Sequence, residues 1–114
     1  MKEVLNSIIE ECVENNIPVS IFKDKNKGTY YEISGFSKSG IATLYLSEGK
    51  VICETRYDTI DEIENFHELS LIAFEWYMNY KNRSPFENPE SYWAEYWVKK
   101  GLMKKELVTV YSLI

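Results

Sequence analysis

Four short segments rich in β-branched and aromatic residues follow one another through the first half of the chain, and a few turn-forming residues separate each from the next. The predicted strands are Val19–Lys23, Thr29–Phe36, Ile41–Leu46 and Val51–Tyr57. Connections this short join antiparallel neighbours, because a parallel neighbour needs a crossover of about a dozen residues. The segments therefore predict an antiparallel meander.

Helical patterns flank the predicted meander. Over Lys2–Asn15, apolar residues recur on one stripe of a helix, which Pro18 cannot continue. A longer helix is predicted from the capping box Thr59–Glu62 to about Tyr80–Asn82, and its second half is apolar on nearly every side. A helix that is apolar all round is covered all round, so we expect the sheet on one side and a further element on the other. Phe74 is expected to be buried at its centre.

The C-terminal third supplies the predicted covering element. Asn88 and Pro89 are typical of a helix start, and Gly101 is typical of a helix end. The aromatic residues at helical spacing between them are Tyr92, Trp93, Tyr96 and Trp97. We interpret this stripe as a core layer, and a binding surface is the alternative. Residues Leu107–Ile114 are rich in β-formers and are predicted to add a fifth strand.

Together the elements predict a single α+β domain spanning residues 1–114. It is an antiparallel meander of four to five strands packed on an N-terminal helix and a long second helix, with a short third helix and a C-terminal strand. A length of 114 residues, with 45% apolar and 27% charged residues, is typical of one globular domain. No apolar stretch approaches the roughly 18 residues of a membrane span, and the N-terminus lacks the apolar region of a signal peptide. We therefore expect a soluble cytoplasmic protein without a membrane partner.

Cys12 and Cys53 fall on the predicted apolar faces, where a reduced cysteine packs like a small hydrophobic residue. Two cysteines and one histidine are too few for a disulfide framework or a multi-histidine metal centre. The glycines fall singly at turns and helix ends, and none forms a phosphate-binding loop. We therefore expect no cofactor and no metal.

Acidic residues gather where the second helix is predicted to begin. Residues 58–114 hold 6 basic and 10 acidic side chains, against 7 and 8 in residues 1–57, and the whole chain carries a net charge of -5. The concentrated carboxylates are those of Asp58, Asp61, Glu62, Glu64 and Glu68. Compensation of the helix dipole and plain solvation explain such a run. The alternative is a docking face for a basic partner, which Glu10, Glu11 and Glu14 would extend.

The missing catalytic motifs, the acidic balance and the many aromatic residues together favour a small protein-binding module. The predicted protein-binding residues are Asp61, Glu62, Glu64, Glu68, Tyr92 and Tyr96. The predicted partner is a protein with a basic surface, and the aromatic helices also offer a homodimer contact. Inhibitors of nucleases, toxin-immunity proteins and phage anti-defence proteins share this small acidic profile. An inhibitor of a nuclease, toxin or defence complex, of bacterial or phage origin, is therefore the specific form of the prediction.

Two alternatives from other classes stay open. A nucleic-acid-binding domain would stack bases on Tyr30 and Phe36 of the sheet, although the acidic balance disfavours phosphate backbones. An enzyme would use His67, the one imidazole in the chain, with Glu64 as its orienting carboxylate. No nucleophile stands at a motif spacing from His67, so no catalytic residue is predicted.

Overall fold

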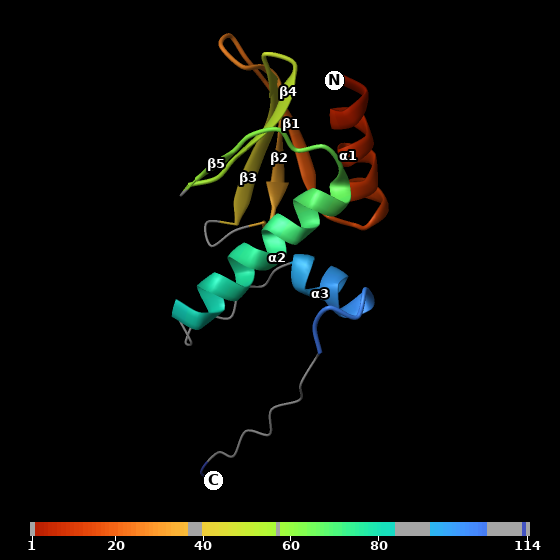
Figure 1. The fold of residues 1–114 in the computed structure, drawn as a ribbon, viewed down its shortest axis with the longest axis vertical. Helices are drawn as coiled ribbons and strands as arrows, with labels where there is room; N and C mark the ends of the chain where they lie inside the picture. The colour runs from red at the N-terminus through yellow and green to blue at the C-terminus, as the bar shows by residue number, and fades with distance from the viewer. Residues whose placement is uncertain (1, 37–39, 57, 84–91, 105–112, 114) are drawn as a thin grey trace.

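The computed structural model describes residues 2–36, 40–56, 58–83, 92–104 and 113. The elements, in chain order, are α1 (Lys2–Glu14), β1 (Val19–Asp24), β2 (Gly28–Ser34), β3 (Ile41–Ser47), β4 (Lys50–Glu54), β5 (Thr59–Ile60), α2 (Phe66–Arg83) and α3 (Tyr92–Lys99). The sheet has the order β1-β2-β3-β4-β5, and every pair is antiparallel (Figure 1). The predicted α+β meander is confirmed. The predicted strand 107–114 lies outside the described residues, apart from Leu113.

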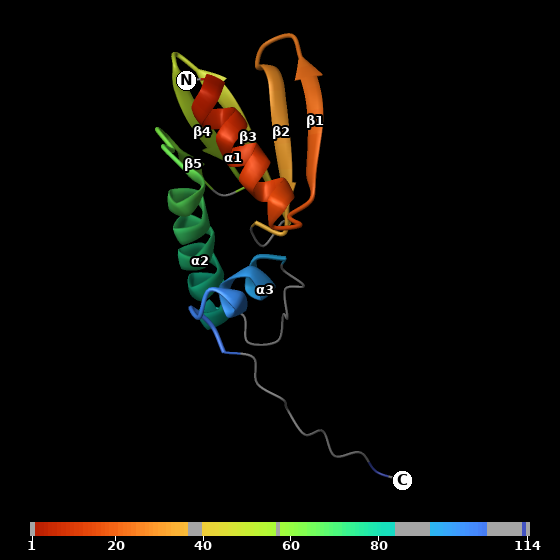
Figure 2. The same ribbon diagram turned by 90° about the vertical axis from the view of Figure 1, so that its right-hand side faces the viewer.

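Helix α1 lies across one face of the sheet (Figure 2), and its buried side chains are those of Leu5, Ile8 and Cys12. Its end follows from local chemistry. Asn16 adopts the left-handed conformation with a φ of 59°, and the Ile17 N–H donates to the Cys12 carbonyl at 2.9 Å. This is the hydrogen bond of a Schellman motif, which closes a helix before its chain turns away.

The core lies between α1 and the sheet face that it covers. Ile33, Leu44 and Cys53 are fully buried there, and Leu44 stands opposite Cys53 in the register of β3 with β4. Both cysteines of the chain are free and buried, as predicted. Burial raises the pKa of the Cys12 thiol to about 12, and it does the same for Cys53.

Helix α2 begins at Phe66, so the prediction of a helix start at the capping box Thr59–Glu62 is wrong. Thr59 and Ile60 instead pair with Glu54 and Cys53 of β4. The N-cap of α2 is instead Asn65, in the following segment Asn65–Glu68, which also has the form of a capping box. The Asn65 Oδ1 accepts a hydrogen bond from the Glu68 N–H at 2.8 Å, and the Glu68 Oε2 accepts one from the Glu64 N–H at 2.8 Å.

A second group of buried side chains joins α3 to α2. Trp93 and Trp97 are fully buried, so the core interpretation of these two aromatic residues is confirmed. Phe36, which lies just after β2, packs edge to face with Trp93 with ring centroids 5.9 Å apart, and this contact connects the group to the sheet.

The long second helix is less enclosed than predicted. Leu69 and Ala73 are fully buried, whereas Phe74 is only partly buried. The rings of Phe74 and Trp97 pack edge to face with their centroids 5.2 Å apart. Leu71 is 45% exposed. Among the described residues of α2, one face is buried, whereas the face that carries Leu71 is exposed. The predicted burial of the helix on every side is therefore wrong for that second face.

Candidate protein-binding site

The acidic segment, defined as Asp58, Asp61, Glu62, Glu64 and Glu68, links β4 and β5 to the first turn of α2. The side chains of Asp58, Asp61, Glu62 and Glu64 are exposed, and that of Glu68 is partly buried. Asp61 and Glu62 stand in the connection between β5 and α2, before the helix begins. Glu62 has a φ of 59°, and the Ile63 N–H donates to the Val51 carbonyl at 3.0 Å, which ties the connection to β4. A fixed backbone thus presents these carboxylates to solvent.

Lys50, the first residue of β4, faces two carboxylates of the acidic segment. Its Nζ lies 3.0 Å from the Glu62 Oε1 and 4.0 Å from the Asp61 Oδ2. The hydrogen bond with Glu62, followed by the negative charges of Glu62 and Asp61, raises the pKa of Lys50. The basic residue that is missing from the segment itself is therefore supplied from elsewhere in the fold. Among the described residues, Lys50 pairs with two of the five carboxylates of the acidic segment, so the segment keeps a net negative charge.

A shallow hollow of about 440 Å³ opens beside these carboxylates. Its lining residues are Val4, Gly49, Lys50, Val51, Glu62, Ile63 and Glu64. Val51 and Ile63 are each 2% exposed, so they form an apolar floor, and the charged side chains of Lys50, Glu62 and Glu64 stand at the rim. An apolar centre with a charged rim has the pattern of a protein-binding surface.

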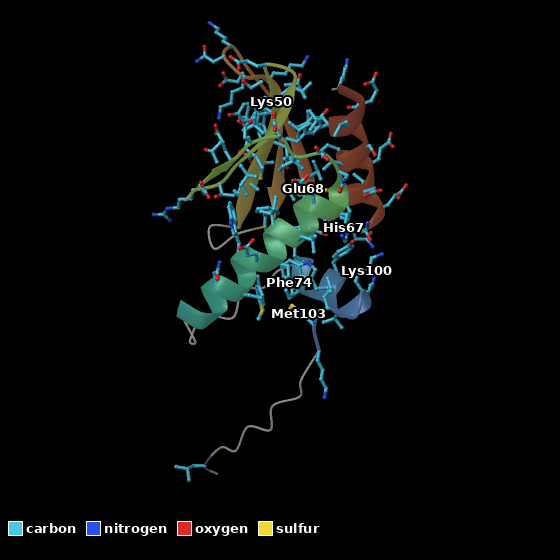
Figure 3. All side chains as sticks on the ribbon, viewed as in Figure 1. Lys50, His67, Glu68, Phe74, Lys100 and Met103 are labelled. Atoms are coloured by element: carbon cyan, nitrogen blue, oxygen red, sulfur yellow. The ribbon has the colours of Figure 1, made fainter. Side chains whose placement is uncertain are left out.

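Glu68 has a structural task that separates it from the other predicted site residues. Its carboxylate accepts from the Glu64 backbone at the start of α2, where a negative charge also faces the positive helix end. Figure 3 shows Glu68 and His67 on the first turns of α2, with Lys50 on the sheet. The structure thus places Glu62 and Glu64 at the rim of the hollow, sets Asp61 against Lys50 next to them, and uses Glu68 as a cap.

Tyr96, the predicted aromatic contact on α3, is partly buried. The rings of Tyr96 and Phe66 pack edge to face with their centroids 5.5 Å apart, and the Lys100 Nζ lies 5.5 Å from the centroid of the Tyr96 ring. Burial raises the pKa of the Tyr96 hydroxyl, and a hydrogen bond with the Ser70 side chain acts in the opposite direction. Tyr96 thus packs against the start of α2 and leaves only part of its surface for a partner. The side chain of Tyr92 lies outside the described part of the chain.

His67 is exposed on the first turn of α2, and among the described residues its imidazole makes no hydrogen bond or ion pair. The Glu64 side chain, which would have oriented it, is exposed on the preceding connection. Within the described part of the chain, no three histidine, cysteine, aspartate or glutamate side chains gather as metal ligands.

The aromatic sheet face differs from the one that the nucleic-acid alternative requires. Phe36 is 2% exposed and packs with Trp76 and Trp93, so it cannot present its ring with Tyr30. The sheet face away from α1 instead carries Tyr30, whose ring stacks on that of Phe22 with centroids 5.4 Å apart. On the same face, Tyr30 stands opposite Tyr45 of β3. Tyr45 donates to the Glu54 carboxylate on the same face. The Lys27 Nζ pairs with that carboxylate at 3.0 Å, so the charge of this lysine is already matched within the sheet face.

Comparison with protein-family models, with curated proteins and with solved structures finds no match to this chain. In the described residues, no helix has the length and apolar character that crossing a membrane requires.

Proposed function

We propose that this chain is a small acidic protein-binding module that docks onto a basic surface of another protein through Asp61, Glu62 and Glu64. One observation carries the proposal. These carboxylates stand exposed before α2 begins, beside an apolar-floored hollow. Asp61 and Glu62 lie outside the capped first turn of α2, so compensation of its dipole does not explain them.

The specific form of the proposal is an inhibitor that covers the basic active surface of a nuclease, toxin or defence complex of bacteria or phages. Substrate sites for nucleic acids are rich in lysine and arginine, and an acidic module competes for the same charges. The buried reduced thiols of Cys12 and Cys53 support a place in the cytoplasm, where thiols stay reduced.

The test begins with a partner isolated by affinity purification from the native cell and identified by mass spectrometry. Stopped-flow association is then measured at two ionic strengths for the wild type and for the double variant Asp61→Asn/Glu64→Gln. Loss of two steering charges is expected to slow association at low salt by about threefold or more, and added salt is expected to shrink the difference.

The matched control is Glu75→Gln/Glu95→Gln, which changes the net charge equally at exposed positions of α2 and α3. Glu68 is left intact in both variants because it caps α2. Equal association rates for the wild type and Asp61→Asn/Glu64→Gln at low salt would refute the acidic docking surface.

A further inference from the structure

Among the residues that the structure describes, β2 is the one strand that pairs with β1, so β1 forms an edge of the described sheet. The Ser34 N–H donates to the Pro18 carbonyl at 3.1 Å, and the register continues from Val19 opposite Ile33. Hydrogen-bonded pairs alternate along an antiparallel ladder, so Ser20 and Phe22 bond to β2. The backbone groups of the alternate residues Val19, Ile21 and Lys23 therefore point away from the sheet.

The open edge is also apolar. Ile21 is 64% exposed and Phe22 is 41% exposed, and they lie on opposite faces of the strand. An exposed edge with large apolar side chains is a template for pairing with a further strand. The other edge differs, because β5 has only two residues.

We propose that β1 pairs antiparallel with β1 of a second copy of this chain, joining the two five-stranded sheets into one. The outward-pointing residues select the register. With Ile21 opposite Ile21 of the other copy, Val19 of each copy stands opposite Lys23 of the other. All three residues then exchange backbone bonds across the twofold axis, which makes about six hydrogen bonds.

Charge complementarity favours a second copy over an unrelated strand. Strand β1 and the turn after it carry the exposed Lys23 and Lys25, and α1 ends beside the start of β1 with Glu11 and Glu14 (Figure 2). The last turn of α1 holds no basic residue. Antiparallel pairing lays the basic turn of each copy beside the acidic helix end of the other, where positive charge also meets the negative end of the helix dipole.

The dimer leaves the proposed docking surface free. The acidic segment borders β5, and β1 is at the opposite edge of the same sheet. The two copies would thus present their acidic segments at the two far ends of the joined sheet.

Sedimentation equilibrium tests the pairing. The wild type is expected to dimerise, whereas Ile21→Lys and Ile21→Glu each place like charges face to face and are expected to raise the dissociation constant at least about tenfold. An equimolar mixture of the two variants is expected to recover the dimer. Leu71→Lys is the control, since it puts the same charge at an exposed apolar position of α2 and is expected to dimerise as the wild type does.

Oxidative cross-linking tests the register independently of the charges. The Cα atoms of a hydrogen-bonded pair lie about 5.5 Å apart, which a disulfide can span, so Ile21→Cys is expected to form a covalent dimer. Lys23→Cys would hold its two thiols about four residues out of register, roughly 13 Å along the strand, and is expected to stay uncrosslinked. Cys12 and Cys53 are fully buried and give no background in the folded chain.

Two results would overturn the proposal. One is a wild type that sediments as a monomer at its highest soluble concentration, the outcome expected if β1 serves only a strand from another protein. The other is a dimer that Ile21→Lys leaves unchanged, which would place the contact on another surface. Melting curves for every variant separate loss of pairing from loss of folding.

Discussion

The start of α2 offers a sharp test, because two boxes of the same kind compete for the cap. In the structure, Asn65 caps the helix through its Oδ1, which accepts from the Glu68 N–H at 2.8 Å. Asn65→Ala leaves that N–H without its partner and is expected to cost about 1 kcal/mol. Unfolding entropy of about 2.1 cal/mol/K per residue over 114 residues turns this into a fall in Tm of about 4 °C.

Thr59→Ala is the matched variant, since Thr59 would be the cap if the earlier box were used. Thr59 is exposed in β5 and pairs through its backbone with Glu54, so the substitution is expected to stay within about 0.5 kcal/mol, or about 2 °C. Differential scanning calorimetry of both variants measures the two shifts. A fall in Tm for Thr59→Ala that equals or exceeds that for Asn65→Ala would refute the assignment of the cap.

Three further predictions concern the core and two titrating groups. Leu69→Ala removes a fully buried side chain and is expected to cost about 2–5 kcal/mol in urea denaturation, whereas Leu71→Ala, at a position 45% exposed, is expected to cost less than about 1 kcal/mol; equal costs would contradict the assignment of faces. The thiols of Cys12 and Cys53, with pKa values raised to about 12 by burial, are expected to react with a thiol reagent at pH 8 only after denaturant unfolds the chain; stoichiometric labelling of the native protein would contradict this. Hydrogen bonds from a tyrosine and then a lysine lower the pKa of Glu54 below 4.5, so its contribution to stability is present above pH 4.5 and is lost as the pH falls through the folded-state pKa; Glu54→Gln is expected to flatten the acid limb of stability against pH, and parallel curves would count against it.

Local chemistry explains why the meander was predictable from the sequence. Each turn carries a residue suited to positive φ, such as Gly28 at 72° and Gly49 at 79°, and β-formers lie between the turns. The predicted strand ends therefore fall within a few residues of the observed ones.

The start of α2 was not predictable by the same means. Thr59–Glu62 and Asn65–Glu68 both have the form of a capping box, and the pairing of Thr59 with Glu54 decides between them. That pairing depends on where β4 lies, which a pattern within one helix does not contain.

The candidate site also has features that were predictable from the sequence and features that were not. Exposure of Asp61, Glu62 and Glu64 follows from their charge and was predicted. Two features depend on contacts between distant segments and could not be predicted: the ion pair of Lys50 with Glu62, and the burial of Phe36 against Trp93.

Pairing of each strand with its neighbour along the chain also sets an expectation for the order of folding. The loops that the sheet must close are short, so their entropic cost is small and the meander can form early, even as the chain leaves the ribosome. Docking of α3 closes a much longer loop, because Phe36 must meet Trp93. Association of the aromatic residues of α2 and α3 with the sheet is therefore expected to be the late event in folding, and substitutions at Trp93 should accelerate unfolding more than they slow folding.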